Sequence, residues 1–202
     1  KLVQVGKRCG SHSSSQHFIN KQLVDAASKY LVVVRLKGGD PMIFGRAQEE
    51  IDALEKANVR YEIVPGITTA LAASAELKQP PTNRDLSRTL TLTTLPGRCA
   101  HEDHKTAIYY MARDQLSEVA TTLINQGYTV NTPVCLMESV SLPTQRSFGC
   151  TLEELRFGDV HHHFLDKQPV VVMVGEVHRK KLHTLIPLIE SQNHFNVFQA
   201  AS

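Results

Sequence analysis

The chain has 202 residues, of which 42% are hydrophobic and 21% are charged, and its formal net charge is +2 at pH 7. These values are those of an ordinary globular protein with one large or two small domains, and they exclude a strongly basic nucleic-acid-binding composition. No apolar run is long enough to cross a bilayer, so we expect neither a membrane nor a nucleic-acid partner. Residues 1–100 hold 14 Lys and Arg against 9 Asp and Glu, whereas residues 101–202 hold 8 against 11. A cationic site is therefore expected mostly in the first half.

The first half alternates between strand and helix patterns. The continuous run YLVVVRL at 30–36 is typical of a parallel strand that is covered on both faces. Apolar residues at helical spacing, such as Phe44, Ala47 and Ile51, indicate helices between the strands. The patterns predict strands over 1–8, 30–36, 60–66 and 89–94, and helices over 16–29, 44–59 and 67–77.

The second half shows the same alternation. The polar stretch at 97–105, with its glycine and charges, is the best candidate for a linker. After it, the patterns predict strands over 106–111, 132–139, 144–150 and 168–177, and helices over 114–127, 151–157 and 178–189. We therefore expect an α/β protein with two α/β lobes, 1–96 and 106–202. The first lobe is expected to be incomplete at its start, because its first strand begins at residue 2 without a lead-in.

Cysteine and histidine residues give no sign of a metal site. The four cysteines have no CxxC spacing and no signal peptide pattern precedes them, so reduced thiols in a cytoplasmic protein are the simplest interpretation. Residues 161–163 are three adjacent histidines, whose side chains cannot all face one ion on a regular element. We therefore expect no metal.

Glycine-containing loops follow several predicted strands, where open α/β sheets bind their ligands. In KGGDP (37–41) the glycines allow a ligand to approach the backbone, and Asp40 can accept hydrogen bonds from it. In PGITTA (65–70) a helix opens with hydroxyls and free amides. Taken alone, either loop is explained more simply as a turn, and neither is a GxGxxG or GxxxxGK[ST] motif. The residues alone therefore indicate only a small adenosine-like or anionic ligand.

Basic residues accompany these loops. Guanidinium groups that converge on the loop face would suit a ligand with many carboxylates, because they bind carboxylates through two hydrogen bonds. Solvated surface charge is the alternative interpretation. The set comprises Lys7, Arg8, Arg35, Lys37, Arg46, Arg84 and Arg88.

Several strings match a known family in order and approximate spacing: VGKR, VVRLKGGDPMIFGR followed by EE, VPGITTALAA, TNRD, YYM, QR and VGEV. On these strings the chain resembles the tetrapyrrole methylases over nearly its whole length. The long glycine string is most similar to members that methylate uroporphyrinogen III on the way to sirohaem and cobalamin. The resemblance implies two α/β lobes with the active site in the cleft between them. It also implies S-adenosyl-methionine as co-substrate, no metal, and a cytoplasmic homodimer.

The resemblance further implies roles for individual residues. Lys7 would be the catalytic residue, and the carboxylates of the substrate would bind Arg8, Arg35, Arg46 and Arg84. S-adenosyl-methionine would contact Gly38, Gly39, Asp40, Ile43, Thr68, Thr69, Met111, Val140 and Val170. Without the resemblance, a methionine such as Met111 at a strand end would be taken as core filling.

The sequence departs from the family in one main respect. Members normally open with a strand and a glycine-proline loop, and neither occurs in this sequence. Two alternatives therefore stay open beside the methylation of uroporphyrinogen III to precorrin-2. One is a methylase of another tetrapyrrole or of a diphthamide or ribosomal RNA target. The other is a truncated, non-catalytic fragment that binds S-adenosyl-methionine.

Overall fold

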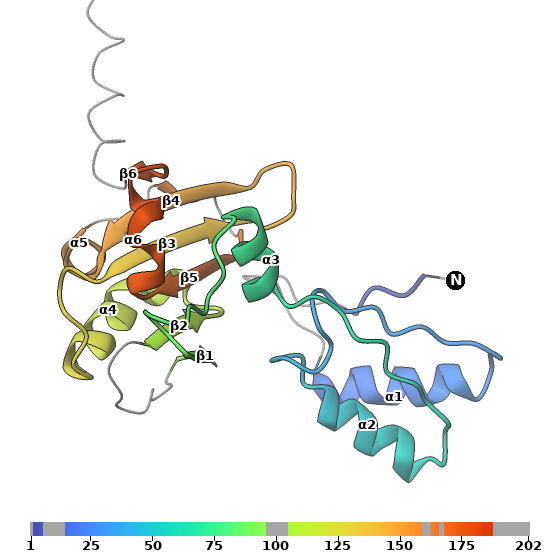
Figure 1. The fold of residues 1–202 in the computed structure, drawn as a ribbon. Helices are drawn as coiled ribbons and strands as arrows, with labels where there is room; N and C mark the ends of the chain where they lie inside the picture. Colours follow the sequence, from blue (N-terminus) through green and yellow to red (C-terminus); the bar gives the residue numbers. More distant parts are fainter. Residues whose placement is uncertain (1, 6–14, 96–104, 159–162, 166–167, 188–202) are drawn as a thin grey trace, which may run out of the picture. The chain divides into compact units, whose positions relative to one another are not determined.

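The computed structural model describes residues 2–5, 15–95, 105–158, 163–165 and 168–187 (Figure 1). The chain forms two compact units, residues 1–68 and 69–202. This division differs from the lobes expected from the sequence, 1–96 and 106–202, which stay a prediction.

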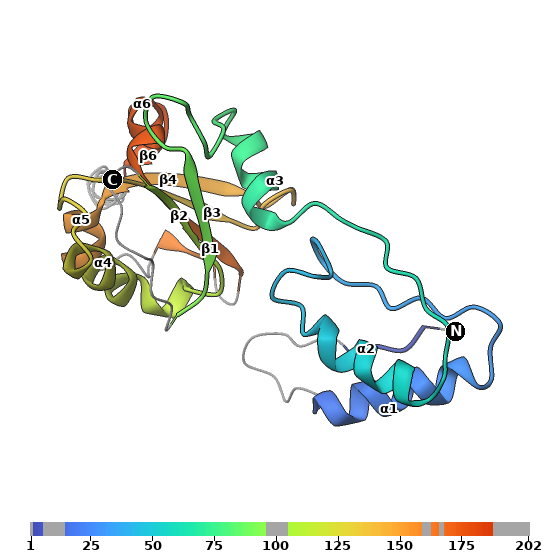
Figure 2. The ribbon, with the colours of Figure 1, turned by 60° about the horizontal axis from the view of Figure 1, so that its bottom comes forward.

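The first unit contains two helices, α1 (Gln16–Ala27) and α2 (Ala47–Lys56), which lie side by side (Figures 1 and 2). Ser15 caps α1, because its Oγ accepts a hydrogen bond from the Phe18 amide at 3.2 Å. The two helices are joined by Asn20, whose Nδ2 donates to the Glu49 carbonyl at 2.8 Å. Both helices were predicted from their apolar spacing, and both are confirmed.

The strands predicted in this unit at 1–8, 30–36 and 60–66 are wrong for the residues that the structure describes. The run at 30–36 has no strand partner, and Val34 and Leu36 are 79% and 83% exposed. β-Branched side chains favour extended backbone, but a strand also needs a neighbouring segment to pair with its N–H and C=O groups. No described segment of this unit provides one.

The second unit is built on one six-stranded sheet with the order β1-β2-β5-β3-β4-β6. β5 runs antiparallel to both of its neighbours, β2 and β3, and β1 is parallel to β2. The carboxyl ends of β1, β2 and β3 therefore lie at the same edge of the sheet. The strands are β1 (Thr89–Thr93), β2 (Lys105–Tyr109), β3 (Pro133–Glu138), β4 (Arg146–Thr151), β5 (Val170–Val174) and β6 (Ile186–Pro187). The α/β class is confirmed, with every described strand in this unit.

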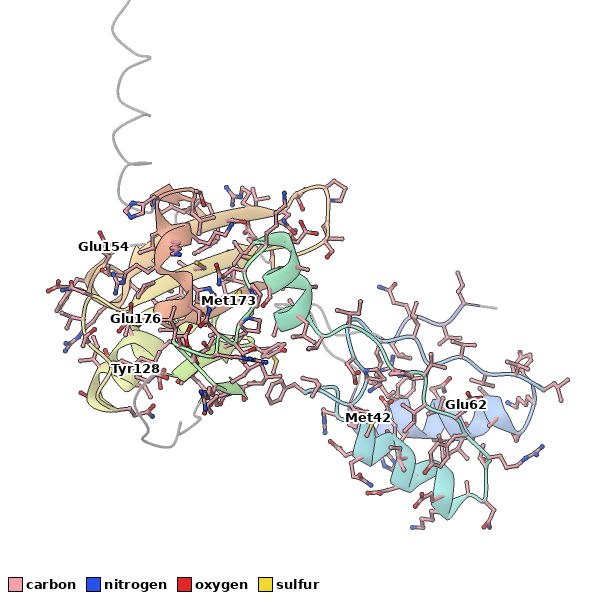
Figure 3. All side chains as sticks on the ribbon, viewed as in Figure 1. Met42, Glu62, Tyr128, Glu154, Met173 and Glu176 are labelled. Atoms are coloured by element: carbon pink, nitrogen blue, oxygen red, sulfur yellow. The ribbon has the colours of Figure 1, made fainter. Side chains whose placement is uncertain are left out.

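Helices cover both faces of the sheet (Figures 1 and 2). Alternate strand residues divide the core, because successive side chains point to opposite faces. Ala107, Val134 and Val172 belong to a cluster with residues of α4 and α5, whereas Ile108 and Met173 (Figure 3) belong to a cluster with residues of α3. The helices are α3 (Thr69–Glu76), α4 (Leu116–Asn125), which follows a short 3-10 turn η1 (Arg113–Gln115), α5 (Leu152–Phe157) and α6 (Arg179–Leu182).

The helix predicted at 178–189 is largely wrong. A 3-10 turn, η3 (Glu176–His178), leads into α6, which has only four residues, and the chain then forms β6. The two residues of β6 pair in parallel with Phe148 and Gly149 of β4. A Cβ at Gly149 would lie 3.1 Å from Leu182 Cδ2 and 3.2 Å from Leu185 Cβ, so glycine allows the segment after α6 to lie close to β4. Helical spacing in the sequence could not show this competing sheet contact.

Two buried cysteines lie on neighbouring strands. Cys135 of β3 and Cys150 of β4 are both free thiols. Burial raises the pKa of Cys135 to about 12 and raises the pKa of Cys150 further, so neither sulfur forms a reactive thiolate near neutral pH. Cys135 packs in the cluster that includes α3 residues, and Cys150 packs in the cluster that includes residues of α4 and α5.

His178, the last residue of η3, is fully buried, and neither ring nitrogen has a hydrogen-bond partner among the described residues. Burial lowers the pKa of His178 from 6.5 to about 4. The unfolded chain therefore binds a proton at a higher pH than the folded chain does. His178 therefore does not lower the free energy of unfolding above about pH 6.5, where it is neutral in both states. The free energy of unfolding falls as the pH drops from 6.5 towards 4, because only the unfolded chain then takes up the proton.

We expect His178→Leu to remove part of the acid sensitivity of folding. The wild-type chain should lose up to about 3 kcal/mol more unfolding free energy between pH 7 and pH 4 than the variant, because only the wild type buries an imidazole. Urea unfolding at a series of pH values measures this difference. His183→Leu is the matched control, since His183 is exposed. Parallel pH profiles for wild type and His178→Leu would contradict the prediction.

Candidate functional site

The loop that joins the run at 30–36 to α2 is held in a specific conformation. Gly39 has a φ of 70°, which favours glycine, but Phe44 and Arg46 also have positive φ values, 50° and 54°. Such backbone costs energy for non-glycine residues and gathers at functional sites. Met42 (Figure 3) and Ile43 present exposed apolar side chains from the same loop. The loop therefore combines backbone strain with apolar surface, as expected of a ligand contact.

Asp40 connects this loop to the segment that precedes α3. One carboxylate oxygen accepts a hydrogen bond from the Met42 amide at 2.8 Å, and the other accepts from the Gly66 amide at 3.3 Å. The predicted glycine loops, KGGDP and PGITTA, are therefore brought together within the first unit. Thr68 follows Gly66 by two residues and is buried, and Thr69 begins α3, so the two threonines stand at the helix start as predicted.

Glu50 is a buried charged residue among the described residues of the first unit. Its side chain is 7% exposed. The carboxylate oxygens lie 3.2 Å from Arg35 Nη2 and 2.9 Å from Lys37 Nζ, and one of them accepts a hydrogen bond from Gln16 Nε2 at 3.2 Å. Lys37 also donates to the carbonyl of Gly45, which closes the glycine loop across its base. Two cations share one carboxylate, so the cluster keeps a net positive charge.

The other predicted substrate-binding residues are less enclosed. Arg46 binds both oxygens of Glu49 at 2.6 Å, and this contact raises the pKa of Arg46. Both partners of that pair are about half exposed. Arg84 is exposed on the turn closed by the Asn83–Ser87 bridge. Lys7 and Arg8 lie outside the described residues.

The remaining predicted cofactor contacts gather at one edge of the sheet. β2 and β5 are antiparallel, and their register pairs Tyr109 with Val172. Met111, two residues after Tyr109, therefore reaches the edge at which β5 begins with Val170. Val140 follows β3, whose last residue, Glu138, pairs with Val170.

The loops at this edge carry unusual backbone. Met111 has a φ of 54° and is 69% exposed, which is incompatible with core filling. Ser139 and Ser141, on either side of Val140, have φ values of 54° and 64°. Strain in non-glycine residues often gathers at binding sites, and here it lies at the carboxyl ends of two strands.

Several organising residues were missed by the sequence analysis. Glu50 stood only as part of the EE string, and Gly66 only as one residue of the PGITTA loop, without its contact to Asp40. Glu138 is fully buried, and its carboxylate accepts hydrogen bonds from Arg146 at 2.8 Å and from the Leu165 amide at 2.6 Å. Arg146 stood only as part of the QR string, which gave no sign of its buried partner.

No group of three or more His, Cys, Asp and Glu in the described residue ranges could hold a metal ion. Among the helices of the same ranges, none combines the length and the apolar character that a membrane span requires.

Comparison with known proteins gives consistent results. The family described as Tetrapyrrole (Corrin/Porphyrin) Methylases matches residues 2–156. A uroporphyrinogen-III C-methyltransferase of Pseudomonas aeruginosa is 37% identical over 187 residues, which cover 89% of this chain and 76% of the relative. A siroheme synthase of Psychrobacter sp. is 38% identical over 192 residues, 90% of this chain. The chain spans only 35% to 43% of the length of siroheme synthases such as this one.

Solved structures agree with the sequence relatives. Uroporphyrin-III C-methyltransferase from Thermus thermophilus, in complex with S-adenyl homocysteine, is similar with a TM-score of 0.67 and 31% identity. The similarity covers 82% of this chain and 75% of that chain.

We expect Glu50→Gln to destabilise the first unit strongly. Removing the carboxylate leaves Arg35 and Lys37 without their shared counter-ion, and loss of one partner from a buried ion pair costs about 3–5 kcal/mol. Glu49→Gln is the matched control, because its half-exposed pair with Arg46 should contribute nothing measurable. Hydrogen exchange of the backbone amides in α1 and α2 at increasing urea concentrations measures both variants. Equal stability of the two variants would contradict the prediction.

Proposed function

Because the chain belongs to the tetrapyrrole methylase family, we propose that it methylates uroporphyrinogen III to precorrin-2 with S-adenosyl-methionine, in sirohaem and cobalamin biosynthesis. The observation that supports this proposal most is the gathering of Met111, Val140 and Val170 at one strained edge of the sheet. The names of the related methyltransferases agree with it.

The cofactor side of the proposal uses the two joined loops and the sheet edge. Gly38 and Gly39 would bring backbone amides close to the ligand, with Asp40, Ile43, Thr68 and Thr69 beside them. A Cβ at Gly38 would meet no atom within 4 Å, so the space beside it is open. The cofactor contacts proposed in the second unit, taken by itself, are Met111, Val140 and Val170. Such groups bind and orient a nucleoside through backbone polar atoms and apolar contact.

The substrate side of the proposal uses Arg8, Arg35, Arg46 and Arg84. Arg46 is the best placed of the described ones, because its half-exposed pair with Glu49 can exchange for a substrate carboxylate. Arg35 is held by Glu50, so its contribution is the net positive charge that it shares with Lys37. That charge would attract a polyanionic tetrapyrrole over some distance.

The proposed chemistry asks mainly for positioning. S-adenosyl-methionine supplies an already activated methyl group. The protein then has to hold an electron-rich pyrrole carbon in line with that group, which fixed loops can do. A side chain that moves a proton as the macrocycle rearranges would help, and Lys7 is the residue proposed for it. The cytoplasmic location and the homodimer also stay part of the proposal.

The direct test supplies uroporphyrinogen III and S-adenosyl-methionine labelled in its methyl group. We expect label to appear in the tetrapyrrole. Arg46→Gln should raise the KM for uroporphyrinogen III about tenfold, since the variant loses a charge-assisted hydrogen bond to a substrate carboxylate. Arg60→Gln, at an exposed arginine outside the proposed site, is the control.

Other outcomes of this assay select the alternatives. Label transferred only to another tetrapyrrole, a diphthamide precursor or ribosomal RNA would assign a different substrate. Binding of S-adenosyl-homocysteine in a calorimeter without transfer to any of them would support the non-catalytic fragment.

Met111→Gly tests the sheet edge separately. Glycine accepts a φ of 54° without strain, so the variant should be at least as stable as the wild type, by up to about 1 kcal/mol. If Met111 contacts the cofactor, the Kd for S-adenosyl-homocysteine should nevertheless rise several-fold. Lys78→Gly is the matched control, because Lys78 is exposed and has a φ of 51°. A Met111→Gly chain that binds as tightly as Lys78→Gly would remove Met111 from the site.

A further inference from the structure

Asp40 uses both oxygens of its carboxylate inside the protein. The oxygen that faces Met42 forms a turn within the glycine loop, at 2.8 Å. The oxygen that faces Gly66 crosses to a segment 26 residues further along the chain, at 3.3 Å. A side chain engaged at both oxygens is oriented by the two backbone amides rather than towards open solvent.

The two segments joined by Asp40 are in close backbone contact. A Cβ at Gly66 would lie 2.3 Å from the carbonyl oxygen of Gly39 and 3.1 Å from its carbonyl carbon. No side chain fits at that distance, so glycine is required at position 66 for the approach. Gly39 itself has a φ of 70°, so its own lack of a side chain allows the loop to turn at the point of contact.

We propose that Asp40 is a positioning residue that locks the glycine loop to the segment before α3. This proposal deepens the proposed function and rests on it, because both locked segments hold residues assigned to the cofactor. The lock fixes Thr68, two residues after Gly66, relative to Gly38 and Gly39. A ligand that binds both segments then meets groups already in place, and less ordering opposes its binding.

The first experiment tests the lock without any ligand. Asp40→Asn keeps the size of the side chain but offers one acceptor oxygen in place of two. Hydrogen exchange of the full chain should show the amide of Gly66 or Met42 exchanging about tenfold faster than in the wild type, as expected for one lost hydrogen bond of about 1.5 kcal/mol. Asp52→Asn is the matched control, because Asp52 accepts a hydrogen bond from Gln48 on the exposed face of α2.

A second variant separates geometry from charge. Asp40→Glu keeps the charge but moves the carboxylate by one methylene, so it should also speed exchange at these amides. Wild-type exchange at both amides in Asp40→Asn would overturn the proposal. Wild-type exchange in Asp40→Glu would overturn it too, because a negative charge, without the exact position of the carboxylate, would then be enough to protect the two amides.

The third measurement concerns the proposed cofactor. The Kd for S-adenosyl-homocysteine should rise about tenfold in Asp40→Asn and in Gly66→Ala, and the double variant should bind no worse than the weaker single variant, because both changes break one lock. Effects that multiply in the double variant, with unchanged amide exchange, would show instead that Asp40 affects cofactor binding without holding the two segments together, and would overturn the proposal. If the wild-type chain binds no S-adenosyl-homocysteine, the proposed function fails, and amide exchange still decides the lock.

Discussion

The first unit depends on one buried carboxylate. Among its described residues the buried side chains are Ile19, Glu50 and Thr68, so a large apolar core is not what holds these segments together. Glu50 instead binds Gln16 of α1, Arg35, and Lys37 at the start of the glycine loop. A charge shared in this way holds its partners in one geometry, because any displacement leaves a buried ion without compensation. The place of the glycine loop follows from that constraint.

The second unit obeys a different constraint, the direction of its strands. β2 and β3 point the same way on either side of β5, so the loop after each of them emerges at the edge where β5 begins. The core on both faces fixes the strands, and the loops absorb the strain as positive φ values. A rigid sheet that carries strained loops is a common way to hold binding groups in fixed positions.

Sequence patterns predicted most of the second unit, because alternating and helical apolar spacing there coincides with a real core. They failed at 30–36, where the same apolar run has no partner to pair with, since periodicity says nothing about neighbours distant in sequence. For the candidate site, the sequence indicated individual residues but not the contacts between them. The resemblance selected Asp40, Met111 and Val170, but neither the acceptor role of Asp40 towards Gly66 nor the ion pairs of Glu50 could be read from local spacing.

The two buried thiols offer a separate view of each layer of the second unit. Cys135 and Cys150 lie on adjacent strands but pack against opposite layers of helices. An alkylating reagent reaches either sulfur only after the covering layer has opened, since neither thiol ionises while it is buried. Comparing the rates of modification at the two positions would therefore show which layer of helices detaches first when the protein opens.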